Sequence, residues 1–229
     1  MTHPLSLQSL AFAWPQQPNL INIPSLELAA GEHLFIQGPS GSGKSTLLNL
    51  IAGFQSGYRG HIALSDHDLS TLSRAQLDRL RADRLGVLFQ QFNLLPYLNL
   101  IENVTLPCRF SRARMRSACE RSGSVDAEAC RLLAHLNLDP EQLSKRPVSS
   151  LSIGQQQRVA AARALIGSPA LVLADEPTSA LDPEHRDQFI HLMLQESAIT
   201  GSSLVLVSHD PSLASSFSRT LTLGAQPSC

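Results

Sequence analysis

The sequence predicts an α/β fold built around a parallel-rich sheet, because apolar strand patterns alternate with well-marked helices. Ala170–Ala174 and Leu204–Val207 are continuous apolar runs of strand length, as parallel strands covered on both faces require. A helix is expected between them, since Asp182 is a good N-cap residue and Pro183 suits the first helical position. Strand–helix–strand order implies right-handed crossovers, which place both strands in one parallel sheet.

The first third of the chain predicts further strands and two helices. Leu5–Leu28 alternates short apolar pieces with prolines, which is typical of small antiparallel strands joined by turns. His33–Gln37 predicts a buried strand, and a helix is expected after it over Lys44–Ala52. The remaining expected elements are strands at Ile62–Leu64 and Val87–Phe89 and a helix at Ser73–Arg84.

The middle third predicts a lobe of helices. No convincing strand pattern occurs between Pro96 and Ser149, and a helix is expected from about Ser152 to Ile166. We therefore expect one domain over residues 1–229. Its core and an antiparallel β subdomain would take about 1–89 and 166–229, and its helical lobe about 92–165.

Composition excludes several classes of protein. Hydrophobic residues make up 43% of the 229 residues and the net charge is -1, which excludes a disordered chain. The absence of a basic excess argues against bulk-charge binding, and no nucleic-acid partner is expected. No stretch approaches the ~18–20 apolar residues of a membrane-spanning helix. With no signal peptide visible, an intracellular location is expected.

Residues 38–46 predict a phosphate-binding loop. They fit the pattern G-x-x-x-x-G-K-[ST] between the expected strand and helix. In such a loop the backbone N–H groups surround phosphate oxygens, the lysine adds a charge, and the hydroxyl that follows binds Mg²⁺. A Ser/Gly-rich linker is the alternative, but the flanking elements disfavour it. The expected nucleotide-binding residues are Gly38, Pro39, Ser40, Gly41, Ser42, Gly43, Lys44, Ser45 and Thr46.

Two carboxylates end the strand near residue 174. Asp175 and Glu176 are expected at the carboxyl edge of the sheet, where ligands of open α/β folds bind. Solvated acids at a strand end are the simpler interpretation, but the phosphate-binding loop favours a site. We expect Asp175 to hold Mg²⁺ and Glu176 to polarise the attacking water.

Further segments, in the expected order, resemble the ATP-binding subunit of an ABC transporter over nearly the whole chain. Leu151–Arg158 resembles the signature motif of that family, and Ser179–Asp182 resembles its D-loop. Ser208–Asp210 is similar to the switch-histidine segment, and Gln90 to the Q-loop glutamine. Trp14 occupies the place of the aromatic residue that stacks on adenine.

The resemblance implies that the chain binds ATP and Mg²⁺ and hydrolyses ATP. It also implies a head-to-tail dimer with a second ATPase subunit, expected to be identical, in which each ATP lies between one phosphate-binding loop and the opposite signature. The implied catalytic residues are Glu176, His209 and Gln90; the implied metal ligands are Ser45, Gln90 and Asp175; the further nucleotide-binding residues are Trp14, Ser152, Gly154, Gln155 and Asp182.

Several of these residues have alternative interpretations. Ser152 with Gln155 also forms the pattern of a capping box, and Asp182 also serves as a plain N-cap. Phe12 competes with Trp14, and Gln91 competes with Gln90.

Ile153 departs from the family pattern, which usually has glycine there. Its β-branched side chain fills space near the opposite subunit's phosphates and disfavours positive φ. We expect a working site with slow turnover; the alternative is a site that binds ATP but hydrolyses it poorly.

The segment Gln90–Val104 resembles the subgroup of ATPases that serves lipoprotein release, macrolide export and septal cell division. In that subgroup it contacts a separately encoded membrane permease, whereas its alternative here is plain core packing. The resemblance implies a cytoplasmic motor subunit, peripheral on the inner face of the membrane, that drives export or extrusion of a lipoprotein, lipid or peptide. The alternative function is an ATP-dependent scaffold with little transport.

Cys108–Arg121 contains five arginines and one acid, Glu120. Such a run can approach anionic headgroups, but a solvated helical face is the expectation we favour.

Overall fold

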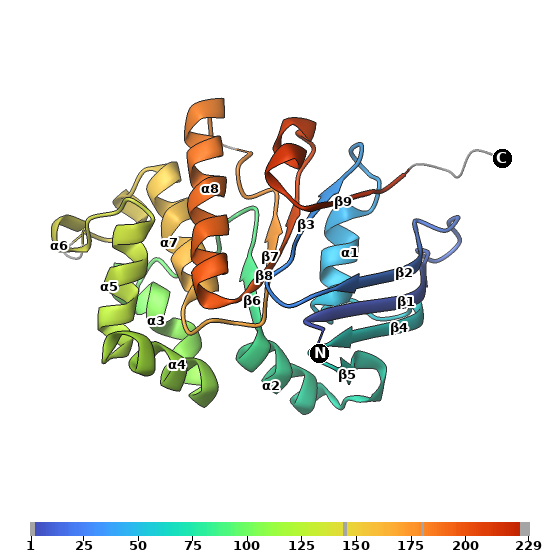
Figure 1. Ribbon diagram of the computed structural model, residues 1–229, viewed down its shortest axis with the longest axis horizontal. Coiled ribbons are helices and arrows are strands. Elements are labelled where there is room, and N and C mark those ends of the chain that lie inside the picture. The colour runs from blue at the N-terminus through green and yellow to red at the C-terminus, as the bar shows by residue number, and fades with distance from the viewer. Residues whose placement is uncertain (1–2, 144–145, 180, 225–229) are drawn as a thin grey trace.

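Two sheets lie on either side of helix α1 (Lys44–Ile51) in the computed structural model, which describes residues 3–143, 146–179 and 181–224 (Figure 1). Within these ranges one sheet has five parallel strands in the order β6-β7-β8-β3-β9. They are β3 (His33–Gln37), β6 (Leu85–Leu88), β7 (Leu171–Asp175), β8 (Ser203–Val207) and β9 (Arg219–Thr222). The predicted α/β class with a parallel-rich sheet is confirmed.

Strands β7 and β8 are apolar throughout because both faces of the parallel sheet are covered. Leu173 and Val205 belong to a core shared with α1 and the antiparallel sheet. Val172 and Leu204 point to a second core, which the helices cover. The alternation follows the two-residue period of a strand, so each strand contributes to both cores.

The other sheet is antiparallel, in the order β2-β1-β4-β5. Its strands are β1 (Leu5–Phe12), β2 (Ile21–Leu28), β4 (Arg59–Leu64) and β5 (His67–Asp68). Leucine and isoleucine side chains of β1, β2 and β4 are buried against α1. The predicted antiparallel strands are confirmed; β5 was not predicted, because two residues carry no periodic signal.

Helices between the sixth and seventh strands form a group on one side of the molecule (Figure 1). This group contains α3 (Leu100–Phe110), α4 (Arg112–Ser122), α5 (Val125–His135), α6 (Pro140–Leu143) and α7 (Ile153–Leu165). Two further helices flank the parallel sheet, α2 (Arg74–Arg84) before β6 and α8 (Pro183–Thr200) after β7. The proposed lobe limits of 92 and 165 stay a prediction.

The short 3-10 turns lie at Leu69–Thr71, Val148–Ser150 and Pro211–Ser216. Of the helices that the structure describes, none combines the length and the apolar character that crossing a bilayer requires.

Candidate active site

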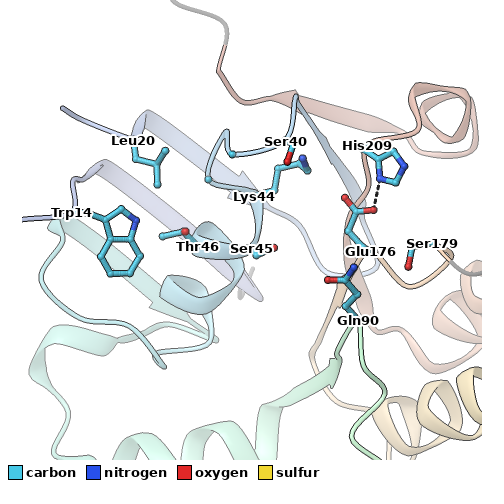
Figure 2. A pocket seen from close by; sticks show the side chains of 12 residues that line it. Trp14, Leu20, Ser40, Lys44, Ser45, Thr46, Gln90, Glu176, Ser179 and His209 are labelled. Carbon is cyan, nitrogen blue, oxygen red and sulfur yellow. Dashed lines mark hydrogen bonds and ion pairs between the residues drawn. The ribbon is translucent and has the colours of Figure 1, made fainter. Parts of the chain in front are cut away.

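A pocket of about 540 Å³ lies beyond the carboxyl ends of the parallel strands. Figure 2 shows the phosphate-binding loop and Trp14 on one side of it, and Gln90, Glu176 and His209 on the other. The topology therefore brings together residues that are up to 195 positions apart, from Trp14 to His209. Its lining residues are Trp14, Leu20, Ser40, Gly41, Gly43, Lys44, Ser45, Thr46, Gln90, Glu176, Ser179 and His209.

The phosphate-binding loop connects β3 to α1. At two of its positions only glycine fits, because a side chain would collide with neighbouring atoms. Gly43 caps α1 with a φ of 93°, and a Cβ there would lie 2.9 Å from the Leu20 side chain. At Gly38 a Cβ would lie 2.6 Å from the backbone oxygen of Leu223. Larger residues at either position would push the loop away from its neighbours.

Lys44 places a buried cation under the loop. Its ammonium group donates to the carbonyl oxygens of Gly38 at 2.8 Å and Pro39 at 3.1 Å. Neither partner is charged, and no described carboxylate forms an ion pair with Lys44. The Ser42 hydroxyl is also buried, without a hydrogen-bond partner among the described atoms. A charged donor and an unpaired hydroxyl in one loop are suited to an incoming anion.

Ser45, which lines the pocket, is hydrogen-bonded to Asp175. The Ser45 hydroxyl donates to Asp175 Oδ1 at 3.0 Å, which joins the start of α1 to the end of β7. Burial raises the pKa of the Asp175 carboxyl and Glu176 adds to this effect, while the Ser45 hydrogen bond and Lys44 oppose it. Hydroxyl and carboxylate oxygens are the ligands that Mg²⁺ prefers, so this donor set fits the ion.

Glu176 and His209 are in contact on the same side of the pocket. His209 Nδ1 lies 2.6 Å from Glu176 Oε2, and Glu176 is mostly buried while His209 is exposed. Glu176 adopts a left-handed backbone with a φ of 47°, which costs a non-glycine residue about 1–3 kcal/mol. Its N–H donates to the Val207 carbonyl at 3.0 Å, so the neighbouring strand holds this conformation in place.

The structure separates the competing aromatic and amide residues. Phe12 is buried in the core, whereas Trp14 is 39% exposed and packs edge-on against Phe12, with ring centroids 5.1 Å apart. Trp14 lines the pocket and Phe12 does not. Gln90 also lines the pocket, while Gln91 is exposed outside it. The geometry thus favours Trp14 and Gln90 over their rivals.

The signature residues lie away from this pocket in the same chain. Ser152 caps α7, where its hydroxyl accepts from the Gln155 N–H at 3.2 Å and the Gln155 side chain accepts from the Ser152 N–H at 3.0 Å. The capping box is therefore present. Gly154 follows, and Ile153 is 58% exposed beside it. A second molecule would be needed to bring this end of α7 to a nucleotide.

Asp182 also lies outside the pocket lining. It caps α8 by accepting from the His185 N–H at 3.1 Å, and its hydrogen bonds with the His185 backbone and ring lower the pKa of its carboxyl. Ala180, part of the segment that resembles the D-loop, lies outside the described residues.

Two residues at or near the site were not predicted from the sequence. Leu20 lines the pocket and does not stand out by pattern, whereas Ser179, which also lines it, belongs to the segment that resembles the D-loop. Arg163, in the last turn of α7, donates to the Asn93 carbonyl at 2.7 Å and to the Phe92 carbonyl. Both acceptor residues are left-handed, with φ of 51° and 57°, so Arg163 holds the strained segment that follows Gln90.

A family model described as ABC transporter matches residues 21–179. The chain belongs to the ABC transporter family. It is 39% identical over 190 residues to an uncharacterised ABC transporter ATP-binding protein of Methanocaldococcus jannaschii, MJ0796, which covers 83% of this chain and 79% of that one. It is 44% identical over 189 residues to the macrolide export ATP-binding/permease protein MacB of Marinobacter nauticus, over 82% of this chain and 28% of MacB. The predicted likeness to macrolide-export ATPases is confirmed.

Solved structures of ABC cassettes have the same fold. A dimeric, post-hydrolysis structure of the MJ0796 cassette bound to ADP and Pi superposes with a TM-score of 0.80 at 33% identity. The superposition covers 96% of this chain and 94% of that one. A second dimeric structure of MJ0796 gives a TM-score of 0.81. The chain is therefore an ATP-binding and ATP-hydrolysing cassette of this family, as the sequence predicted.

Proposed function

We propose that this pocket binds ATP with Mg²⁺ and that the residues around it have separate roles in hydrolysis. The observation that supports this most directly is the placement of two pairs, Ser45–Asp175 and Glu176–His209, beside the buried cation Lys44. Lys44 would exchange its carbonyl partners for phosphate oxygens. Trp14 offers an exposed ring face for the adenine, on the side of the pocket away from His209 (Figure 2).

Glu176 is the proposed general base. Its carboxylate would accept a proton from the attacking water, and His209, in contact with the same carboxylate, would orient it and approach the terminal phosphate. Ser45, Asp175 and Gln90 would hold Mg²⁺. When bound, the ion neutralises charge on the phosphates that react.

A second copy of the chain would complete the site. Ser152, Gly154 and Gln155 lie at the start of α7 and are not among the residues that line the pocket of their own chain. The dimeric MJ0796 cassettes support a dimer for this chain as well. In that dimer we assign Ser152 and its neighbours to the phosphates held by the other subunit, with Asp182 near the dimer contact.

The segment Gln90–Val104 is the proposed contact with a membrane permease. Tyr97 is 77% exposed in it, and Phe54, 52% exposed, stacks on Phe89 directly before Gln90. Phe92 instead packs partly against the core, so Tyr97 and Phe54 are the better candidates for contact. The name of MacB joins an ATP-binding part to a permease, and this chain spans only 28% of it. We place the chain at the inner membrane face, driving export through a separate permease.

The decisive experiment is ATP hydrolysis by the purified chain across protein concentration. The rate per subunit should rise with concentration, because each site needs two copies. Glu176→Gln should bind ATP and lose hydrolysis by about a hundredfold or more, the contribution of a general base. Asp187→Asn, at an exposed carboxylate outside the pocket, is the matched control. A wild-type rate per subunit that is independent of concentration contradicts the composite site.

A further inference from the structure

Three arginines and a phenylalanine line a groove of about 380 Å³ outside the nucleotide pocket: Arg79, Arg109, Phe110 and Arg112. Arg109 lies in the last turn of α3, Arg112 begins α4, and Arg79 belongs to α2. The helices α2 and α4 lie side by side at this place (Figure 1). We call this surface the basic groove.

Two of the three arginines that line the basic groove, Arg109 and Arg112, are not neutralised within the described part of the chain, whereas Arg79 pairs with Asp83. Arg109 and Arg112 have no hydrogen bond or ion pair there, and neither has Arg116, one turn beyond Arg112 on the same face of α4. Like charges four residues apart repel each other. The nearby carboxylate of Asp83 already accepts from the Ser111 hydroxyl at 2.6 Å and lies 3.7 Å from Arg79. An excess of cations thus gathers on a chain whose net charge is -1.

The other two arginines of the segment Cys108–Arg121, Arg114 and Arg121, form hydrogen bonds within the chain. Arg114 is 3% exposed and donates to the carbonyl oxygens of Ile166 and Ala164, both at 2.8 Å. Arg121 donates to Ser168 and lies 3.8 Å from Glu128. The expectation of a solvated helical face is therefore wrong for Arg114. Three arginines remain with their charge directed to solvent.

An exposed aromatic ring accompanies these charges. Phe110 is 75% exposed, and Met115 on α4 is 43% exposed. A protruding ring contributes little to the core, and a protein partner would need a matching pocket to receive it. A bilayer surface accepts such a ring anywhere at the headgroup level, beside arginines that pair with lipid phosphates.

We propose that the basic groove binds the anionic headgroups of a phospholipid surface. Arg109, Arg112 and Arg116 contact the headgroup phosphates, and Phe110 inserts among the headgroups. The proposal rests on the proposed function in one respect, since a membrane permease would hold the chain beside a bilayer. It adds a direct lipid contact, which does not depend on a permease.

The test is sedimentation of the full chain with phospholipid vesicles. Vesicles of phosphatidylcholine are compared with an equal mixture of phosphatidylcholine and phosphatidylglycerol. The chain should sediment with the anionic vesicles and not with the neutral ones. Binding should fall steeply between about 0.1 and 1 M salt, because the screening length shrinks from about 10 Å to about 3 Å.

Variants identify the surface. Arg109→Gln/Arg112→Gln should weaken vesicle binding about 30-fold, because each arginine near an anionic surface contributes about a fivefold gain. Arg109→Lys/Arg112→Lys should keep most binding, since headgroup attraction depends mainly on charge. Phe110→Ser should weaken it by about tenfold or more, from the lost insertion of the ring. The control Arg59→Gln/Arg74→Gln changes the net charge equally at two positions that do not line the groove.

ATP hydrolysis without vesicles is measured for every variant and should not change, which shows that the variants fold. A chain that binds anionic vesicles but never hydrolyses ATP would contradict the proposed function and leave the lipid contact standing. Equal sedimentation with both vesicles, or equal binding by wild type and Arg109→Gln/Arg112→Gln, overturns the lipid contact. Loss of permease-stimulated hydrolysis with unchanged vesicle binding also overturns it, and assigns the groove to an acidic protein segment.

Discussion

At the scale of single residues, Asp175 lowers the stability of the fold when its buried carboxyl ionises, and it has a proposed role in metal binding. Because burial raises the pKa of its carboxyl, the folded state favours the protonated form. The native state therefore loses stability as the pH rises from the ordinary pKa of 3.8 to the raised value; on acidification this loss begins to shrink at the raised value and is gone below 3.8.

Asp175→Asn removes that charge and keeps an acceptor for the Ser45 hydroxyl. The ligand-free variant should have a higher Tm than wild type near neutral pH, and the difference should shrink as the solution is acidified. Thermal unfolding across pH measures this, with the exposed turn residue Asp66→Asn as control. Hydrolysis of ATP with Mg²⁺ should be lost in the same variant. A Tm below that of wild type near neutral pH contradicts the burial cost.

Ile153 is the residue at which this chain departs from the pattern of its family. Its side chain is 58% exposed at the start of α7, where the proposed second copy would bring its phosphates. Ile153→Gly should raise the turnover number at saturating ATP, because the space beside Ser152 opens. Ile153→Ala should give an intermediate rate at a smaller cost to the helix. Equal rates in all three proteins would show that this side chain does not slow hydrolysis.

At the scale of elements, Arg163 connects the helix α7 to the segment after Gln90. Arg163→Ala should destabilise the fold by about 1.5–3 kcal/mol, the usual value for hydrogen bonds of a charged group. The left-handed residues Phe92 and Asn93 would lose their restraint. Amide hydrogen exchange over residues 90–98 should therefore increase selectively.

Arg163→Lys is the matched variant, because an ammonium group cannot reproduce the planar fork that reaches both carbonyls. It should give partial protection of the same segment. A uniform rise in exchange over the whole chain, with no preference for 90–98, would show that Arg163 only stabilises the fold.

Elements with strong local signals were predictable from sequence, and those set by tertiary contacts were not. The strand His33–Gln37 and the cap of α8 at Asp182 appear as expected. Strand β6 was expected at 87–89 but spans Leu85–Leu88, since Gly86 interrupts the apolar run. A Cβ at Gly86 would lie 2.2 Å from the Ala164 oxygen, so packing against α7 requires the glycine.

The residues of the candidate site also fall into two groups, those that a local motif predicts and those that only tertiary contacts bring to the site. The phosphate-binding loop, Asp175 and Glu176 follow local patterns; the loop and Glu176 line one pocket, and Asp175 is joined to it through its hydrogen bond with Ser45. The contact of Arg163 with Asn93 joins residues 70 positions apart, which no short motif records. Leu20 lines the pocket and lies so close to Gly43 that a larger residue there would clash with it, and neither contact leaves a local sequence pattern.

At the scale of the whole molecule, a buried ionic network joins the group of helices to α8. Arg131 on α5 lies between two carboxylates, 2.8 Å from Glu128 Oε1 and 2.6 Å from Glu196 Oε1. The side chains of Glu128 and Glu196 are 2% and 0% exposed. Hydrogen bonds to both raise the pKa of Arg131, so the guanidinium stays charged throughout the physiological range.

Arg131→Met should therefore destabilise the molecule by about 3–5 kcal/mol, because it leaves two buried carboxylates without their shared cation. Chemical denaturation measures the loss. Arg79→Met, at an exposed pair with Asp83, should cost less than about 1 kcal/mol. The triple variant Arg131→Met/Glu128→Gln/Glu196→Gln should recover most of the stability, since it removes the stranded charges together with the cation. If the triple variant is as unstable as Arg131→Met, packing of the Arg131 stem, and not its charge, holds α5 to α8.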